Sequence, residues 1–358
     1  METNRIIQGD CIQVLKSFPD ESIDLIFADP PYNLQLKNEL NRPDSSKVNA
    51  VNDDWDKFSS FNQYDSFTQN WLTECKRVLK HSGSIWVIGS YHNIFRVGSK
   101  LQDLGFWILN DIIWRKSNPM PNFKGTRFTN AHETLIWATK NKNSKYKFNY
   151  DAMKSLNGEL QMRSDWLLPI CNGKERLKIK GEKVHSTQKP EALISRIILS
   201  SSIKNDIVLD PFLGSGTTVA MAKKFSRQWI GIEKNSFYIQ EARKRVVATG
   251  IHNQDILEIT KSKKNEPRIP FGSLIERGFL KPGELLFDGR KRWFAKVRVD
   301  GSLISNDSKG SIHKVGASVQ GLPACNGWHF WHHERTGNII PIDFYRNKLR
   351  SEITSSYL

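Results

Sequence analysis

The stretch Ser22–Ala28 (SIDLIFA), which runs directly into Asp29-Pro30-Pro31-Tyr32 (DPPY), decides the fold class. A short apolar run that ends at prolines predicts a buried strand. Further runs of this kind lie within the first 250 residues: Ser84–Ile88, Phe106–Trp114, Thr134–Ala138, Asp206–Leu209 and Trp229–Ile232. Helical patterns lie between them, and this alternation predicts an α/β fold with a mostly parallel sheet.

Three of the intervening segments have clear helical patterns. From Phe61 to Leu79 the apolar residues recur at steps of three and four, which indicates a helix with one buried face. Gly83 is the expected stop signal of this helix. The other two predicted helices, with their flanking signals, are Glu191–Ser201 with Pro190 at its start, and Ser236–Ala248 with Asn235 as its cap and Gly250 just past its end.

The DPPY motif brings a carboxylate, a rigid backbone and an aromatic ring to the end of a strand, where open α/β sheets bind ligands. Pro30 and Pro31 remove two N–H donors, so the carbonyl groups there are free to accept. Asp29 and the Pro30 carbonyl suit the two hydrogens of an exocyclic amine on a flat ring, and Tyr32 suits stacking on that ring. The structural alternative is a proline-stiffened strand exit with a helix-capping aspartate.

A second strand runs into the glycine-rich segment Asp210–Thr218 (DPFLGSGTT). Gly214 and Gly216 allow the backbone to approach a ligand closely, and the start of the following helix suits an anionic group. No lysine precedes Thr217 and a third glycine is missing, which excludes a P-loop and a GxGxxG motif. Asp210 is suited to an ammonium group. The alternative is a glycine-rich turn that binds no ligand.

The strand Trp229–Ile232 ends at Glu233, and an acid at this position commonly binds ribose hydroxyls. A ligand with an amino acid at one end and a nucleoside at the other satisfies all of these features, and S-adenosylmethionine is such a molecule. Asp10 is a candidate for the adenine amine of that cofactor. The predicted cofactor-binding residues in these segments are Asp10, Cys11, Asp29, Asp210, Phe212, Gly214, Ser215, Gly216, Thr217 and Glu233.

Two stretches interrupt the alternation of strands and helices. Asn33–Ser60 is long and polar, and Lys116–Arg127 contains two prolines and a glycine. Long loops in a compact domain are usually functional. Their basic, amide and apolar side chains are candidates for contacts with phosphates, base edges and the base stack of DNA: Leu34, Arg42, Lys47, Trp55, Asn118, Asn122, Lys124 and Arg127. His92 is a further candidate. For each, the alternative is a solvated loop side chain or a local anchor.

The chain has 358 residues, a net charge of +16 and a pI near 9.6, which suits a polyanionic partner. From Lys261 to the end there are seventeen basic and nine acidic residues, a net charge of +8. This tail follows a charged, proline-containing stretch. We therefore expect residues 1–252 to form the catalytic domain with its DNA-contacting loops, 253–270 a linker, and 271–358 a small β-rich domain that binds DNA through a basic cluster, Arg290, Lys291 and Arg292.

Several classes of protein are excluded by pattern. No apolar run approaches the ~18 residues that span a bilayer, and the start lacks a basic region followed by an apolar one. Cys11, Cys75, Cys171 and Cys325 are scattered, so neither a zinc ribbon nor a disulfide framework is expected. No metal site is expected either. We expect a cytoplasmic protein without a membrane or metal partner.

DPPY followed by DPFLGSGTT resembles the amino-methyltransferases of DNA, in the circularly permuted β order with the catalytic motif first. His185–Pro190 (HSTQKP) is similar to the additional cofactor-binding segment of that group, which adds Thr187 and Lys189 to the cofactor set. The runs FADPPYNLQL, DDWDKF, GSIWVIGSYHNIFRVG and, in the tail, GSIHKVGA and ACNGW resemble the CcrM-type, cell-cycle-regulated adenine methyltransferases. The resemblance covers essentially the whole chain.

This resemblance implies a Rossmann-like, circularly permuted methyltransferase fold, S-adenosylmethionine as donor, and methylation of adenine N6 in duplex DNA at GANTC. The relatives suggest a dimer, so a homodimer is expected, and we expect it to be associated with the nucleoid. Because the base is inaccessible inside a duplex, it has to be flipped out, and stacking on Tyr32 offsets part of the cost. Two alternatives remain: a cytosine-N4 methyltransferase, which more often carries Ser-Pro-Pro-Tyr, and a non-catalytic DNA-binding protein.

Overall fold

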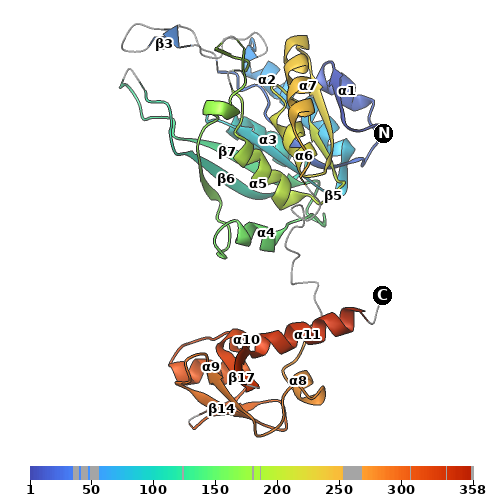
Figure 1. Cartoon of the computed structure of the whole chain (residues 1–358). Coiled ribbons are helices and arrows are strands. Elements are labelled where there is room, and N and C mark those ends of the chain that lie inside the picture. Colours follow the sequence, from blue (N-terminus) through green and yellow to red (C-terminus); the bar gives the residue numbers. More distant parts are fainter. Residues whose placement is uncertain are drawn as a thin grey trace. The chain divides into compact units, whose positions relative to one another are not determined.

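The computed structural model describes residues 1–34, 40–41, 47–48, 56–122, 125–179, 181–185, 187–252, 268–306, 308–335 and 337–355. The chain divides into two compact units, Met1–Ser262 and Lys263–Leu358, and each has a hydrophobic core of its own (Figure 1). The predicted DNA contacts Arg42, Trp55 and Lys124 lie outside the described residues.

The first unit is built on a sheet of eight strands. In spatial order they are β1 (Arg5–Gln8), β12 (Gln228–Glu233), β11 (Ile207–Asp210), β2 (Ile23–Ala28), β5 (Leu79–Gly89), β7 (His132–Thr139), β6 (Trp107–Lys116) and β8 (Asp165–Leu168). β7 runs antiparallel to β5 and β6, and the other neighbours in this sheet are parallel. Because β7 is reversed, Thr134 near its start pairs with Gly89 at the end of β5. The first residues of β7 therefore lie at the sheet edge where the parallel strands end.

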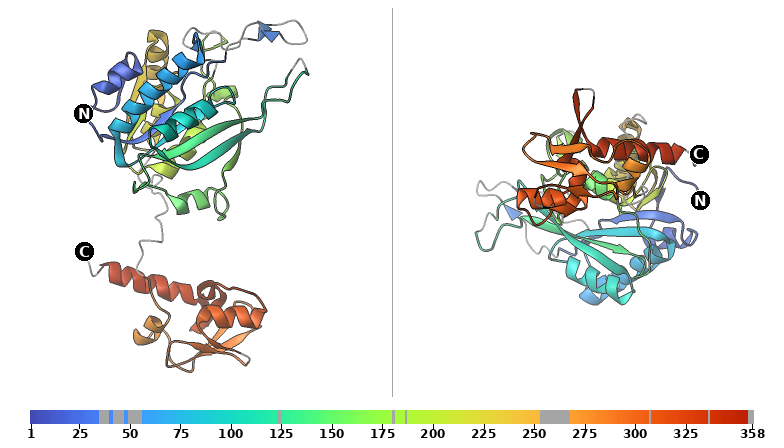
Figure 2. Two further views of the ribbon diagram at one scale, coloured as in Figure 1. Left: turned by 180° about the vertical axis from the view of Figure 1, so that it is seen from behind. Right: turned by 90° about the horizontal axis from the view of Figure 1, so that it is seen from below.

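Helices cover both faces of this sheet (Figures 1 and 2). One core combines strand residues with α1 (Cys11–Lys16), α2 (Phe61–Val78) and α3 (Ile94–Asp103). The other core combines them with α5 (Glu191–Ser201), α6 (Thr217–Lys224) and α7 (Ser236–Ala248). Shorter elements of this unit are α4 (Tyr150–Ser155), a 3-10 turn (Gly173–Glu175), and the strand pairs β3 (Leu40–Asn41) with β4 (Lys47–Val48) and β9 (Lys178–Ile179) with β10 (Glu182–Lys183).

The predicted α/β architecture is confirmed, and the strands before DPPY and before the glycine-rich segment both belong to this sheet. β2 and β11 are neighbours in the sheet although their sequences are far apart. One local prediction is wrong: Gly83 does not stop a helix. Helix α2 ends at Val78, Leu79 already has extended backbone angles, and Gly83 lies inside β5. A Cβ at Gly83 would lie 2.8 Å from the carbonyl oxygen of Asp24, so the glycine permits close strand packing.

The second unit is a six-stranded antiparallel sheet with helices, in agreement with the predicted small β-rich domain. Its strands, in spatial order, are β16 (Lys309–Gly310), β15 (Leu303–Ile304), β14 (Phe294–Val297), β13 (Leu285–Asp288), β17 (Trp331–Arg335) and β18 (Asn338–Pro341). Its helices are α8 (Gly272–Glu276), α9 (Ile312–Gln320), α10 (Gly327–Phe330) and α11 (Ile342–Ser355). Trp328 and Trp331 are buried in its core, where aromatic side chains stabilise a small unit.

Candidate active site

A cavity of about 550 Å³ lies where β1, β2, β11 and β12 end. Both predicted motifs line it. The predicted residues that the cavity brings together are Asp10, Cys11, Asp29, Pro30, Pro31, Tyr32, Leu34, Thr187, Lys189, Asp210, Phe212, Gly214, Ser215, Thr217 and Glu233. Gly216 is the exception among the catalytic and cofactor candidates, because it does not line the cavity.

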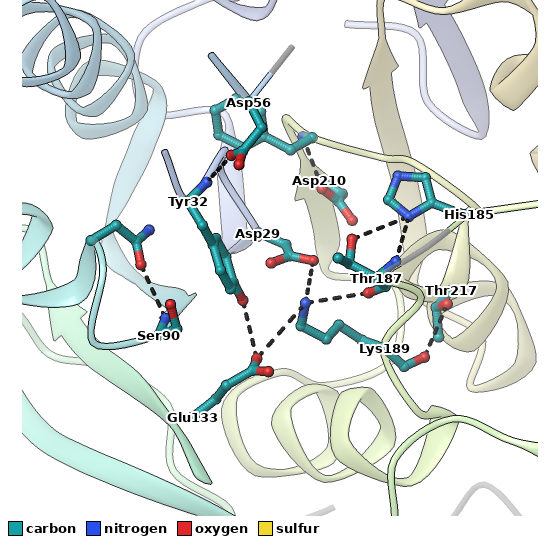
Figure 3. Close-up of polar contacts among 12 residues, drawn as sticks. Asp29, Tyr32, Asp56, Ser90, Glu133, His185, Thr187, Lys189, Asp210 and Thr217 are labelled. Carbon is teal, nitrogen blue, oxygen red and sulfur yellow. Dashed lines mark hydrogen bonds and ion pairs between the residues drawn. The ribbon is translucent and has the colours of Figure 1, made fainter. Parts of the chain in front are cut away.

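Asp29 forms a buried ion pair with Lys189 (Figure 3). The Nζ atom of Lys189 lies 2.7 Å from Oδ2 of Asp29 and 3.3 Å from the carbonyl oxygen of Thr187. Burial raises the pKa of Asp29, and the neighbouring ammonium opposes that rise. The carboxyl group of Asp29 is therefore paired with a lysine that lies 160 positions away in the sequence.

Tyr32 is oriented by a glutamate that the sequence analysis did not identify. The Tyr32 hydroxyl donates a 3.1 Å hydrogen bond to Oε2 of Glu133, the second residue of β7. Lys116, at the end of β6, lies 2.8 Å from Oε1 of the same carboxylate. Although burial acts to raise the pKa of Glu133, Lys189 and Lys116 hold it below the ordinary value. Glu133 thus joins the DPPY ring to the first residue of the 116–127 loop.

The backbone that follows Tyr32 is held by Asp56, which was also not identified from the sequence. One oxygen of Asp56 accepts hydrogen bonds from the N–H groups of Tyr32 (2.5 Å) and Asn33 (2.8 Å), and the other accepts from Leu34 (2.9 Å). Asn33 has a φ of +54°, which turns consecutive N–H groups toward one anion. The turn after DPPY is therefore fixed by a carboxylate 22 positions beyond its last residue.

Glu233 supports the glycine-rich segment. Its Oε2 atom accepts a 2.9 Å hydrogen bond from the N–H of Gly214, and its Oε1 atom accepts from the N–H groups of Lys234 and Asn235. Gly214 has a φ of +51°, and a Cβ there would lie 3.1 Å from the ring of His185. The segment is therefore held open at the cavity wall by its glycine and by an acidic side chain at the end of β12.

The reason for Gly216 differs from the one expected. It has a φ of +77° as the cap of α6, and a Cβ there would lie 2.8 Å from the Cβ of Ala242 on α7. The glycine thus allows two helices to pack behind the loop. Thr217 follows it, and its hydroxyl is held between the carbonyl oxygen of Lys189 (3.3 Å) and the guanidinium of Arg245 (2.8 Å).

Asp210 lacks a nearby cation among its described partners. Burial raises its pKa to about 7, although the N–H of Phe212 donates to it at 3.0 Å, and the negative charges of Asp29 and Glu233 add to the rise. A positively charged ligand group in this cavity would relieve the cost of burying that carboxylate. This is the property expected of a site for the ammonium group of an amino acid.

The remaining cofactor candidates have local structural contacts as well. Asp10 caps α1 by accepting from the N–H groups of Ile12 (3.1 Å) and Gln13 (3.3 Å). Burial raises the pKa of Cys11 to about 12, so its thiol stays protonated. The hydroxyl and the N–H of Thr187 both lie near Nδ1 of His185, at 3.2 and 3.3 Å. Burial lowers the pKa of His185 to about 4, so its ring is neutral.

The DNA-contact candidates of the first unit differ in their surroundings. Leu34 lines the cavity, and Arg127 is exposed, with its guanidinium 2.9 Å from the hydroxyl of Tyr91. Asn118 is a local anchor, because its Oδ1 accepts from the N–H of Ile170 at 2.9 Å. His92 is half-buried against the Tyr91 ring, which fits a structural role. Asn122 is half-buried, and for Lys47 the structure describes only the backbone, in β4.

The basic cluster of the second unit is partly neutralised within the unit. Arg292 pairs with Asp288 at 2.9 Å, and Lys291 pairs with Glu334 at 2.6 Å. Arg290 is exposed. Each of the three side chains remains at the surface, so pairing reduces the local charge without removing it.

Among the described residues, no group of three or more His, Cys, Asp or Glu side chains is arranged to hold a metal ion. In the same part of the chain, no helix combines the length and the apolar character needed to cross a membrane.

Comparison with known proteins agrees with this geometry. A family described as DNA methylase, N6_N4_Mtase, matches residues 23–244, and one described as Restriction Enzyme Adenine Methylase Associated matches residues 252–355. The Type II methyltransferase M.HinfI of Haemophilus influenzae is 50% identical over 344 residues, which cover 96% of each chain. The Type II methyltransferase M2.DpnII of Streptococcus pneumoniae is 43% identical over 244 residues, 68% of this chain and 89% of its own.

Two solved structures are similar. The M1.HpyAVI–SAM complex is 30% identical with a TM-score of 0.50, and the match covers 68% of this chain and 98% of that one. The cytosine-N4-specific PvuII DNA methyltransferase is 23% identical with a TM-score of 0.55, covering 72% and 90%. The second likeness concerns the fold alone.

Proposed function

The chain belongs to the N6/N4 family of DNA methyltransferases, and from that premise we propose that it methylates N6 of adenine at GANTC in duplex DNA. The observation that carries the choice of adenine is Asp29. It heads the DPPY motif in the same cavity as the glycine-rich segment, and cytosine-N4 enzymes more often have serine at that position. GANTC rests on the resemblance to the CcrM-type enzymes, which extends into the tail.

S-adenosylmethionine is the methyl donor of this family, and when bound it supplies an electrophilic methyl group on a sulfonium. The chemistry of the cavity fits it. Asp210 is a buried carboxylate with no counter-cation among the residues that the structure describes, which suits the α-ammonium group. Glu233 retains acceptor capacity for ribose hydroxyls, Asp10 for the adenine amine, and Gly214 opens the wall between them. We assign Cys11, Thr187, Lys189, Phe212, Ser215 and Thr217 to the same binding surface.

On the base side, Asp29 and the carbonyl of Pro30 accept the two N6 hydrogens of adenine. Delocalisation into the ring makes N6 a poor nucleophile, and accepting both hydrogens concentrates the lone pair on nitrogen. The ring of Tyr32 stacks on the flipped base, a contact worth ~1–3 kcal/mol. Positioning and fixed electrostatics, rather than covalent catalysis, supply the rate enhancement.

DNA contacts are assigned to both units. In the first, the candidates are Leu34, Lys47, Asn122 and Arg127, with Arg42, Trp55 and Lys124 in stretches beyond the described residues. In the second, Arg290, Lys291 and Arg292 are exposed and basic, which supports a role for residues 271–358 in binding phosphates. The domain assignment of the tail as DNA-binding rests on this charge.

One assay tests the function. A duplex with a single GANTC site, and a matched duplex in which that site is scrambled, are incubated with methyl-labelled S-adenosylmethionine and digested to nucleosides. We expect N6-methyladenine from the first duplex alone. N4-methylcytosine would show the wrong base, label in both duplexes would refute GANTC, and DNA binding without label would indicate a non-catalytic protein.

We also propose that the enzyme is a homodimer in the cytoplasm, associated with the nucleoid. The resemblance to the CcrM-type enzymes supports the dimer, and the requirement for chromosomal DNA supports the location. Light scattering after size exclusion distinguishes about 41 kDa for a monomer from twice that mass for a dimer. Fluorescent fusion protein that overlaps the stained nucleoid would support the location, and diffuse signal would contradict it.

A further inference from the structure

Glu133 lies between Tyr32 and Lys189 beside Asp29 (Figure 3). Its Oε2 atom lies 3.1 Å from the Tyr32 hydroxyl and 3.9 Å from Nζ of Lys189. Its Oε1 atom lies 2.8 Å from Nζ of Lys116. Because β7 runs antiparallel to its neighbours, Glu133, its second residue, lies at the edge of the sheet where the parallel strands end.

The charges of this cluster are balanced in pairs. Two carboxylates, Asp29 and Glu133, face two ammonium groups, Lys189 and Lys116, and all four side chains are at least four-fifths buried. Lys189 is the shared member, since it lies between both carboxylates. Burial works against its charge, but the two carboxylates keep the pKa of Lys189 above its ordinary value.

This arrangement bears on the role of Asp29. A lysine that paired with Asp29 alone would make this carboxylate a weaker acceptor for an N6 hydrogen. A second carboxylate on the same ammonium group reduces that effect. The hydrogen bond from the Tyr32 hydroxyl to Glu133 also fixes the orientation of the ring that is proposed to stack on the base.

We propose that Glu133 is a positioning residue of the methyl transfer: it shares Lys189 with Asp29, keeps Asp29 a strong hydrogen-bond acceptor, and orients Tyr32. Lys116 sets how strongly Glu133 does so. This inference rests on the proposed function, because it assumes that Asp29 and Tyr32 contact the target adenine.

The titratable groups around the two carboxylates determine the expected pH effects. Lys189, Glu133, Tyr32 and Asp210 face Asp29, while Lys116, Lys189 and Tyr32 face Glu133, and Arg176 acts on Lys189 from a distance. The charge of Glu133 contributes to the raised pKa of Asp29. Removing the charge of Glu133 therefore lowers the pKa of Asp29. Removing Lys116 raises the pKa of Asp29, because the negative charge of Glu133 is then less balanced by a neighbouring cation.

The test compares Glu133→Gln with Lys116→Met in single-turnover methylation of a GANTC duplex, with saturating S-adenosylmethionine, from pH 5 to 9. We expect the rate constant of Glu133→Gln to fall by roughly 10- to 100-fold. The acid limb of its pH profile should move to lower pH, and that of Lys116→Met to higher pH. A merely structural role would lower the rate at all pH values without opposite movements of the limb.

Two controls keep the outcome decisive. Glu182→Gln, an exposed glutamate on β10, should match the wild type, and Lys116→Arg should restore the wild-type profile. Wild-type enzyme that makes no N6-methyladenine would overturn the proposed function. Wild-type enzyme that makes it, with unmoved acid limbs in both Glu133→Gln and Lys116→Met, would overturn only the role of Glu133. If Glu133→Gln fails to fold, Lys116→Met still decides, since it leaves the carboxylate in place.

Discussion

The hydroxyl of Tyr64, on α2, donates a 2.8 Å hydrogen bond to the carbonyl oxygen of Pro31. The side chain of Asn93 donates to the same hydroxyl at 3.2 Å, and Asn93 in turn accepts from the N–H of Ser90. The carbonyl of Pro31 is therefore engaged inside the protein. This contact leaves the carbonyl of Pro30, rather than that of Pro31, as the proposed acceptor for an N6 hydrogen of the base.

Replacing Tyr64 by Phe tests whether this contact fixes the DPPY turn. The change removes one buried hydrogen bond and leaves the Pro31 carbonyl and Asn93 without that partner, so we expect a loss of about 1–2 kcal/mol in the free energy of unfolding. The turnover number should fall while S-adenosylmethionine affinity stays normal. Urea denaturation and steady-state kinetics measure both. Tyr146→Phe, which removes an exposed hydroxyl, is the matched control.

Asp29→Asn should remove most methyl transfer. The amide keeps the shape of the side chain but loses the charge and one of the two acceptor oxygens, and we expect the turnover number to drop by roughly 10²- to 10³-fold. Cofactor affinity, measured by calorimetry, should change much less, because Asp29 faces mainly the base. A variant with an unchanged turnover number would refute the assigned role.

The raised pKa of Asp210 makes cofactor binding depend on pH. Its ordinary value is 3.8 and its folded value is about 7, so between these limits the folded protein holds a proton that the unfolded chain has lost. The contribution of Asp210 to the stability of the free enzyme is highest below pH 3.8 and falls as pH rises to about 7. The ammonium group of the cofactor favours the ionised form. Affinity for S-adenosylmethionine should therefore rise with pH up to about 7 and then level off.

Calorimetry in buffers of different ionisation enthalpy measures this linkage directly. Near pH 6 the wild type should release a proton as the cofactor binds. Asp210→Asn should bind more weakly, release none, and unfold at a higher temperature than the wild type at pH 8. Equal proton release by both proteins would mean that another group titrates.

Gly216→Ala should act on stability rather than on the cofactor. The new methyl group would overlap Ala242 and occupy a left-handed backbone, which together should destabilise the fold by roughly 2–4 kcal/mol. Cofactor affinity of the folded fraction should stay normal. Adding Ala242→Gly should recover the part of the lost stability that is due to the overlap of the two methyl groups. If the double variant is no more stable than the single one, the contact between the helices is not the cause.

Removing the tail separates cofactor binding from DNA binding. A chain ending near Asn265 retains every cofactor motif and both cores of the first unit, so it should fold and bind S-adenosylmethionine. It should lose most DNA affinity and show a shallower loss of binding with added salt, since each phosphate contact adds nearly one unit to the log–log slope. Equal slopes and affinities for the two proteins would assign DNA binding to the first unit alone.

The sequence predicted the elements whose cause is local. Helices α5 and α7 have the predicted bounds, because their caps and periodicity lie within the segments themselves. Likewise, the DPPY and glycine-rich motifs both line the cavity. Gly83 was misread because its reason is a carbonyl on a neighbouring strand.

Glu133 and Asp56 could not be found in this way. Glu133 reaches the site only because β7 runs against its neighbours, and strand direction leaves no mark in an apolar run. Its one signal is a charged residue at the start of a buried strand. Asp56 gave a weaker signal, an acid in the run DDWDKF whose partners lie across the whole intervening loop.

The contact of Asp56 with the turn after Tyr32 also has an evolutionary consequence. The two ends of the 34–56 segment are joined by hydrogen bonds of 2.9 Å or less, so their separation does not depend on what lies between them. Lengthening such a closed segment is entropically cheap, at about 0.6 kcal/mol for each doubling. The segment can therefore be exchanged, extended or shortened by natural variation, or grafted by an engineer, while the methylating turn keeps its geometry. The DNA contacts proposed for this segment can therefore change without rebuilding the catalytic centre.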